Sequence, residues 1–184
     1  TTRKAILYST CFINYNNPGI GEATQKVLSN HGVETQILYP SCCGMPQLEQ
    51  GDIRRVADNA RKITAELLPW VDNGYDVIAL VPSCSLMLKF EWPLILPENQ
   101  DIKKLSNATF DISEYIMDMA RQKQLRGGLK KIEGGVTVHL ACHSRAQNMG
   151  PKAADMLRLI PDTEVVVVDR CSGHGGSWGI MKSN

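Results

Sequence analysis

Residues 33–46 of the chain read VETQILYPSCCGMP, a short run that passes into a segment with a doubled cysteine and a glycine. The first six residues are rich in strand formers and predict a strand. The two prolines and the glycine that follow interrupt regular structure and predict a loop. The doubled cysteine, Cys42 and Cys43, is therefore expected to lie just beyond the carboxyl end of a strand.

The same order recurs on both sides of this stretch. Lys4 to Ser9 and Asp76 to Val81 are predicted strands, and each leads directly to a cysteine. These cysteines are Cys11 and Cys84. Residues 20–31 carry apolar side chains at helical spacing, and Asp52 is a suitable cap for a longer amphipathic helix. Alternating strands and helices imply an α/β fold with parallel strands and right-handed helical crossovers.

A second, shorter series follows. Val136 to Leu140 and Glu164 to Val168 are predicted strands, separated by a helical pattern and followed by Cys142 and Cys171. Glycine pairs at 127–128 and 134–135 bracket a basic connector. We therefore predict two pseudo-repeated halves, residues 1–126 and 127–184, with cysteines at strand carboxyl ends in both.

Prolines interrupt the later part of the first half. Pro93 and Pro97 break helices, so residues 91–110 are predicted to be irregular. Asp111 and Glu114 form a variant of the capping box, which predicts a helix that begins there.

Composition limits the classes of function. The 184 residues are 43% hydrophobic and 21% charged, which is ordinary for a globular domain. The net charge is +1, so the protein has no strong positive electrostatic field that would attract nucleic acid. No apolar run reaches the ~18 residues of a transmembrane segment, and no signal peptide opens the chain. The chain begins with Thr1 rather than Met, and we expect it to be a piece of a longer, cytoplasmic protein.

Six cysteines are too sparse for a disulfide scaffold, and bridges from the adjacent Cys42 and Cys43 are geometrically awkward. An extracellular disulfide protein remains the alternative. The absence of C-x-x-C excludes a thioredoxin motif, a zinc ribbon and a bacterial ferredoxin run. At the shared sheet edge the thiolates of Cys11, Cys42, Cys43 and Cys84 can instead bind an iron–sulfur cluster or zinc.

This cysteine pattern resembles the cysteine-rich CCG domain family, which includes the B subunit of heterodisulfide reductase and the iron–sulfur subunits of glycolate and lactate oxidation systems. The resembling stretches are CFINYNNP (11–18), CCGMP (42–46), SCS (83–85), EWP (91–93), HLACH (139–143) and GGSWG (175–179). They are especially similar to the iron–sulfur C subunits of anaerobic glycerol-3-phosphate dehydrogenases.

The resemblance implies a function. It implies an electron-transfer domain of a multisubunit oxidoreductase rather than a stand-alone catalyst. Its expected partners are a flavoprotein subunit, as electron donor, and a membrane-associated quinone-reducing complex or other carrier, as acceptor. The expected location of the protein is the cytoplasm, as a peripheral protein at the inner face of the membrane.

One departure from the family concerns the cluster type. The heterodisulfide reductase motif closes with C-x-x-C, and its fifth cysteine supports an unusual non-cubane cluster. Met87 occupies that place here. The resemblance therefore implies a four-cysteine [4Fe-4S] cluster in residues 1–126, and direct cleavage of a disulfide is disfavoured.

A second departure concerns residues 127–184. Ser172 replaces one cysteine of the doubled pair, so only Cys142 and Cys171 are left. His139, His143 or His174 would have to complete a second cluster or a zinc site. Otherwise this half is degenerate or truncated.

Two other functions stay open. A zinc-stabilised interaction module would use the same four thiolates without redox chemistry. A heterodisulfide or thiol reductase would act on a mixed disulfide. Nucleotide binding at residues 19–24 is disfavoured, because the glycine-rich loop lacks its third glycine and lies well past its strand.

Overall fold

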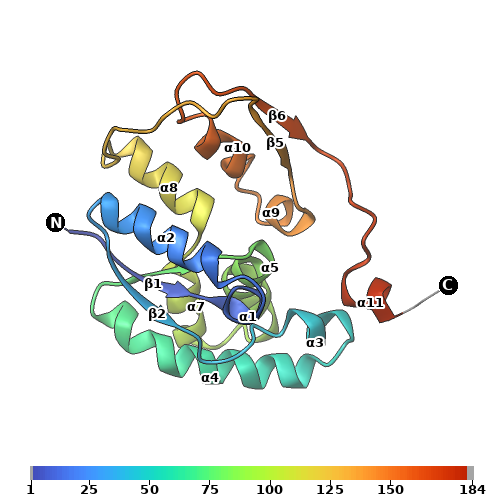
Figure 1. Ribbon diagram of the computed structural model, residues 1–184. Helices are drawn as coiled ribbons and strands as arrows, with labels where there is room; N and C mark the ends of the chain where they lie inside the picture. The colour runs from blue at the N-terminus through green and yellow to red at the C-terminus, as the bar shows by residue number, and fades with distance from the viewer. Residues whose placement is uncertain (1, 182–184) are drawn as a thin grey trace.

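Parallel strand pairs form two sheets in the computed structural model, which describes residues 2–181 (Figure 1). The larger sheet has the order β2-β1-β3-β4. Its strands are β1 (Lys4–Tyr8), β2 (Glu34–Leu38), β3 (Asp76–Ala79) and β4 (Thr109–Asp111). The smaller sheet pairs β5 (Val136–His139) with β6 (Val165–Val168). The predicted α/β class with parallel strands is confirmed, whereas the repeat relation between the halves stays a prediction.

Helices cover both faces of the larger sheet. The helices are α1 (Thr10–Tyr15), α2 (Pro18–Asn30), α3 (Met45–Glu49), α4 (Ile53–Asp72), α5 (Pro82–Leu86), α6 (Trp92–Ile95), α7 (Gln100–Asn107), α8 (Ile112–Arg121), α9 (Cys142–Ala146), α10 (Lys152–Leu157) and α11 (Gly176–Met181), with a π-helical turn at Met87–Glu91. In Figure 1, α2 and α8 lie on one side of the sheet, and α4 and α7 lie on the other. The segment after β6 runs down the side of the molecule and ends in α11 beside α3.

The residues of β1 show why the sheet is buried on both faces. Side chains of a strand alternate between faces. Ile6 and Tyr8 point into the core beneath α4 and α7, whereas Ala5 and Leu7 point into the core beneath α2 and α8. All four are fully buried. A nearly continuous apolar strand of this kind is typical of a parallel sheet covered by helices on both sides.

The structure of residues 100–111 differs from the sequence prediction. They form α7 and β4 rather than an irregular segment. Asn99 caps α7 by accepting a hydrogen bond from Ile102 N at 3.0 Å. Pro93 lies in the first turn of the short helix α6, where a missing N–H costs nothing. The prolines therefore separate helices instead of preventing them.

The predicted helix caps at Asp52 and Asp111 are confirmed. Asp52 is exposed and accepts one backbone hydrogen bond, from Arg55 N at 3.1 Å. Asp111 is buried, and its carboxylate accepts hydrogen bonds from Ser113 N, Ser113 Oγ and Ser85 Oγ at 3.0, 2.6 and 3.0 Å. The second cap is thus part of a buried polar network.

Asp111→Ala should therefore cost more stability than Asp52→Ala. The first change removes a cap and leaves buried hydroxyl and N–H groups without an acceptor, for an expected loss of about 2–4 kcal/mol. The second removes one exposed cap, at about 1 kcal/mol. Urea unfolding of both variants measures the difference. Equal losses would show that the buried network adds nothing to the cap.

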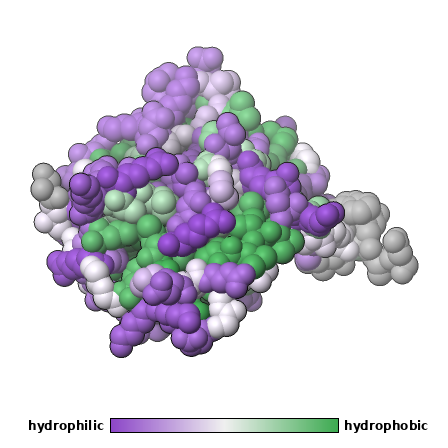
Figure 2. Space-filling model, turned by 90° about the horizontal axis from the view of Figure 1, so that it is seen from above, coloured by the Kyte–Doolittle hydropathy of each residue, from purple (hydrophilic) through white to green (hydrophobic). Residues whose placement is uncertain are grey.

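The smaller sheet leaves apolar surface uncovered. It packs against α10, and its valines Val166 and Val168 are exposed. Leu129 and Ile132 of the connector before β5 are exposed as well. Seen from above, hydrophobic residues gather in the middle of the molecular surface within a hydrophilic border (Figure 2). Among residues 2–181, no helix has the length and apolarity needed to cross a membrane.

Candidate metal centre

Three neighbouring strands deliver cysteines to one edge of the larger sheet. Cys11 is the second residue of α1, shortly after β1, and Cys84 lies in α5, shortly after β3. Cys42 and Cys43 lie in the loop between β2 and α3. Because β2, β1 and β3 are adjacent and parallel, their carboxyl ends share an edge, which is where ligands bind in open α/β sheets.

The four cysteines line one pocket of about 250 Å³. The thiol of Cys43 is hydrogen-bonded to Cys84, with 3.2 Å between the two sulfurs. Cys42 interacts through its thiol with both Cys11 and Cys43. Cys43 and Cys84 are buried, whereas Cys11 and Cys42 are half-buried. The thiols therefore form a row that runs from the hydrophobic core towards the surface.

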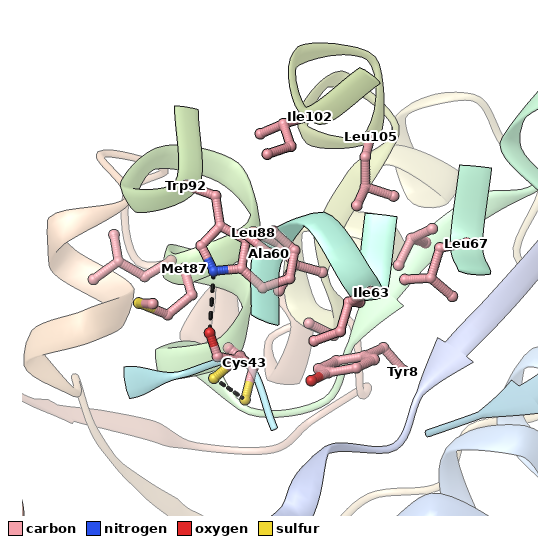
Figure 3. Packing of buried hydrophobic residues seen from close by; sticks show 14 of the residues in the cluster. Tyr8, Cys43, Ala60, Ile63, Leu67, Met87, Leu88, Trp92, Ile102 and Leu105 are labelled. Atoms are coloured by element: carbon pink, nitrogen blue, oxygen red, sulfur yellow. Dashed lines mark hydrogen bonds between the residues drawn. The ribbon is translucent and has the colours of Figure 1, made fainter. Parts of the chain in front are cut away.

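The loop that carries the doubled cysteine is held by the core behind it. Trp92 is fully buried, and its Nε1 donates a hydrogen bond to the carbonyl oxygen of Cys43 at 3.0 Å (Figure 3). The hydroxyl of Tyr8 donates to the carbonyl oxygen of Ser41 at 2.5 Å. Gly44 has a φ of +92°, a left-handed conformation that favours glycine and lets the chain turn into α3.

The thiols of Cys11, Cys42 and Cys43 have pKa values above the ordinary value for cysteine. Burial, and then the nearby Cys42, raise the pKa of Cys11. The hydrogen bond with Cys43, and then burial, raise the pKa of Cys42. The hydrogen bond with Cys42 lowers the pKa of Cys43, but contact with Cys84 and burial outweigh it and raise that pKa well above its ordinary value. Negative charge on these sulfurs therefore needs a positively charged group to offset it.

Backbone groups around the pocket favour sulfur ligands that carry negative charge. The N–H groups of Phe12, Gly44 and Met45 donate hydrogen bonds to the sulfurs of Cys11, Cys42 and Cys43, and each lowers the pKa of its thiol. A set of four sulfur donors with N–H groups directed at them fits an iron–sulfur cluster. Among residues 2–181, no group of three or more His, Cys, Asp or Glu side chains is arranged to hold a single metal ion, whereas a cluster takes only one thiolate at each of its irons.

Met87, which stands where the family motif has a fifth cysteine, lies in the core. Its side chain is fully buried and packs in the cluster that contains Trp92 and Leu88 (Figure 3). The pocket lining is made by other residues, among them the four cysteines. The arrangement is thus one of four cysteines without a sulfur ligand from position 87.

His143 and His174 both line the pocket of the first-half cysteines. The sequence prediction was that a histidine completes a site with Cys142 and Cys171 in the second half. Cys142 and Cys171 are exposed, and neither belongs to the pocket lining that the described residues form.

His139, the third histidine considered, lies with its Nε2 2.6 Å from the carbonyl oxygen of Arg170. The second-half metal site stays a prediction.

The end of the chain closes one side of the pocket. Gly176, at the start of α11, lines the pocket together with Glu49 of α3. A Cβ at Gly176 would lie 2.5 Å from Glu49 Oε1, so a larger residue would displace that carboxylate. The pocket is therefore built from both ends of the chain, an arrangement that the local sequence pattern does not reveal.

Sequence reasoning missed Gln147 and gave no role to Ser85. Both are buried and hydrogen-bonded to each other beside Cys84. A single glutamine after a short helical pattern carries no signal of its own, since glutamine is common on exposed helices. Only the pairing of α9 with α5 reveals it.

Comparison with known proteins confirms the predicted resemblance. Residues 5–89 match the family described as a cysteine-rich domain, CCG. The chain is 30% identical to the C subunit of anaerobic glycerol-3-phosphate dehydrogenase of Escherichia coli (strain K12) over 181 residues, which are 95% of this chain and 44% of that protein. It is 26% identical to lactate utilization protein A of Bacillus pumilus (strain SAFR-032) over 188 residues, which are 96% of this chain and 75% of that protein. It is 28% identical to the B subunit of fumarate reductase (CoM/CoB) of Methanothermobacter marburgensis over 175 residues, 92% of this chain and 32% of that protein. The chain thus spans less than half of the dehydrogenase and fumarate reductase subunits that it matches.

Proposed function

Residues 5–89 of this chain belong to the cysteine-rich CCG domain family, and from that premise we propose that the chain is an iron–sulfur electron-transfer domain of a multisubunit oxidoreductase. Cys11, Cys42, Cys43 and Cys84 are its proposed cluster ligands. The observation that carries the proposal is the convergence of these four thiols, from three separate segments, on one pocket. We propose a [4Fe-4S] cluster, because four cysteines are the usual ligand set and position 87 offers no fifth thiolate.

The residues of the pocket have separate tasks in this proposal. The four thiolates hold the cluster, which when bound accepts and releases single electrons. The N–H groups of Phe12, Gly44 and Met45 stabilise the negative charge on the sulfurs. Burial of Cys43 and Cys84 keeps water from the inner side of the site, and the half-buried Cys11 leaves a short path to the surface.

The relatives' names support a role beside partner subunits in general. Two relatives are named as subunits of a dehydrogenase and of a reductase, which supports a role beside other subunits. We propose that a flavoprotein subunit donates the electrons and that a quinone-reducing complex or another carrier accepts them. On this proposal the domain works in the cytoplasm, as a peripheral part at the inner face of the membrane. Residues 1–126 then form the half with the cluster, and residues 127–184 form a degenerate or truncated second half.

Anaerobic reconstitution tests the cluster directly. Reduced chain incubated with iron and sulfide should bind about four irons and about four sulfides per chain and give an iron–sulfur absorption band. Reduction with dithionite should then give an EPR signal. A parallel sample receives zinc alone. Stable binding of zinc, with no iron retained, would contradict the electron-transfer function and favour a zinc-stabilised interaction module.

A further inference from the structure

Gln147 is a buried polar residue of the second half that contacts the first. It follows α9 directly as its C-cap, and its exposed fraction is only 3%. Its Nε2 donates to Ser85 Oγ at 2.8 Å and lies 3.2 Å from the carbonyl oxygens of Pro82 and His143. Its Oε1 accepts a hydrogen bond from Lys89 Nζ at 3.2 Å. Both polar atoms of the side chain are therefore paired, which is the usual condition for a buried amide.

The partners of Gln147 belong to the segment that carries Cys84. Pro82 and Ser85 lie in α5 on either side of this cysteine, and Lys89 lies in the π-helical turn that follows. The same partners are tied to α8. Ser85 Oγ donates to Asp111 Oδ2 at 3.0 Å, and Lys89 Nζ lies 2.6 Å from Glu114 Oε2. Gln147 thus joins α9 to a buried network that runs behind the site.

Such support matters because α5 cannot hold its own position. The helical stretch that begins with α5 and continues through the π-helical turn to the end of α6 is marginal on its own, so its place depends on tertiary contacts. The inner sulfur of the site, that of Cys84, depends in turn on where α5 lies. The loop of Cys43 is held by Trp92, which lies further along the same helical stretch, and also by the hydroxyl of Tyr8 in β1. The side chains of Cys43 and Cys84 are therefore positioned by different contacts.

The same residue also sets the position of a pocket wall. Gln147 Nε2 approaches the carbonyl oxygen of His143, which closes the last turn of α9. His143 lines the cysteine pocket. A change at position 147 should therefore disturb both Cys84 and the wall opposite the cysteines.

We propose that Gln147 is a positioning residue of the cysteine site: it fixes α5, and with it the Cys84 sulfur, against α9 of the second half. The geometry of the cysteine site then depends on residues of both halves, and not on residues 5–89 alone. The identity of the bound group rests on the proposed function, but the positioning of Cys84 does not. The two can therefore fail separately.

The test measures thiol reactivity in the reduced, metal-free full chain. A maleimide reagent is added in excess, and tandem mass spectrometry follows the labelling of each cysteine with time. In Gln147→Leu, which keeps a side chain of similar volume but removes its hydrogen bonds, Cys84 should be labelled about tenfold faster than in the unsubstituted chain. Cys43 should keep its rate, because Trp92 still holds its loop. The exposed Cys142 and Cys171 serve as internal references.

A matched control is Gln122→Leu. Gln122 is the C-cap of α8, but it is exposed and its side chain bonds to Asp118 of its own helix. This variant should leave the labelling of Cys84 unchanged. Unchanged labelling of Cys84 in Gln147→Leu, or equal acceleration at Cys43 and Cys84, would overturn the proposal, since the latter indicates a loss of global stability. Should circular dichroism show that Gln147→Leu does not fold, Ser85→Ala carries the same test with a smaller change.

A second measurement links the residue to the bound group. After reconstitution, Gln147→Leu should lose iron to a chelator about tenfold faster and should show an altered EPR line shape. If the unsubstituted chain takes up no iron, the proposed function is wrong, and the labelling experiment still decides the role of Gln147. If that chain takes up iron and Gln147→Leu matches it in both EPR and labelling, the positioning role is wrong and the cluster stands.

Discussion

Cys43→Ser should remove nearly all of the iron that the reconstituted chain binds, to below about one iron per chain from about four. Cys43 occupies the centre of the row of thiols, since it interacts with Cys42 on one side and contacts Cys84 on the other. Serine has nearly the same shape but is a poor ligand for iron, so the substitution removes the sulfur donor and little else. Iron and sulfide analysis, with the EPR spectrum of the reduced sample, measures the loss.

Met87→Leu is the control for this experiment. Met87 lies in the adjacent core, and leucine fills a similar volume there at a cost below about 1.5 kcal/mol. Iron uptake should therefore be unchanged, which would also show that position 87 supplies no ligand. Full iron content in Cys43→Ser would show that the sulfur of Cys43 is not needed, and the ligand assignment would then be wrong.

Trp92→Ala is expected to cost the most stability of any single change considered for this chain, about 3–5 kcal/mol. Trp92 is fully buried in the core between α4 and the sheet, and its removal leaves a large cavity. It also leaves the buried carbonyl oxygen of Cys43 without its donor. Such a loss is a large share of the roughly 5–15 kcal/mol that is typical of a native domain. Urea unfolding, monitored by circular dichroism, measures it.

Two further variants separate the causes of that loss. Trp92→Phe keeps most of the ring and removes only the hydrogen bond to Cys43, for an expected loss of about 1–3 kcal/mol. Trp70→Ala removes a tryptophan that is only half-buried and packs edge-on against Tyr75, so its loss should be clearly smaller. A loss in Trp92→Ala no larger than in Trp70→Ala would contradict the central place given to Trp92.

The sequence was informative where local chemistry decides structure. The apolar runs before Cys11 and Cys84 predicted strands because their patterns leave few alternatives, and both strands are present. The helix that begins at Asp52 was predicted for the same reason, since a carboxylate cap satisfies backbone donors only a few residues away. Once the strands are parallel and adjacent, the convergence of their cysteines at one edge follows from geometry.

Sequence reasoning failed where competing local signals had to be weighed. The prolines at 93 and 97 suggested an irregular segment through residue 110, yet α7 and β4 form there. Ile102 and Leu105 of α7 are fully buried in the core that lies between the larger sheet and the helices α4 and α7. Burial of these side chains stabilises a helix that short-range signals alone leave undecided.

The sequence by itself determined the strands that precede cysteines, the helix caps at Asp52 and Asp111 and the order in which the cysteines leave the sheet, because each of these depends on residues close together in the chain. The tertiary structure alone decided that His143 and His174 line the same pocket as the first-half cysteines and that Gln147 reaches Ser85, 62 positions away. Contacts between such distant residues depend on how α9 and the chain's end dock against the sheet. That docking is governed by the summed packing of many side chains, which no local pattern records.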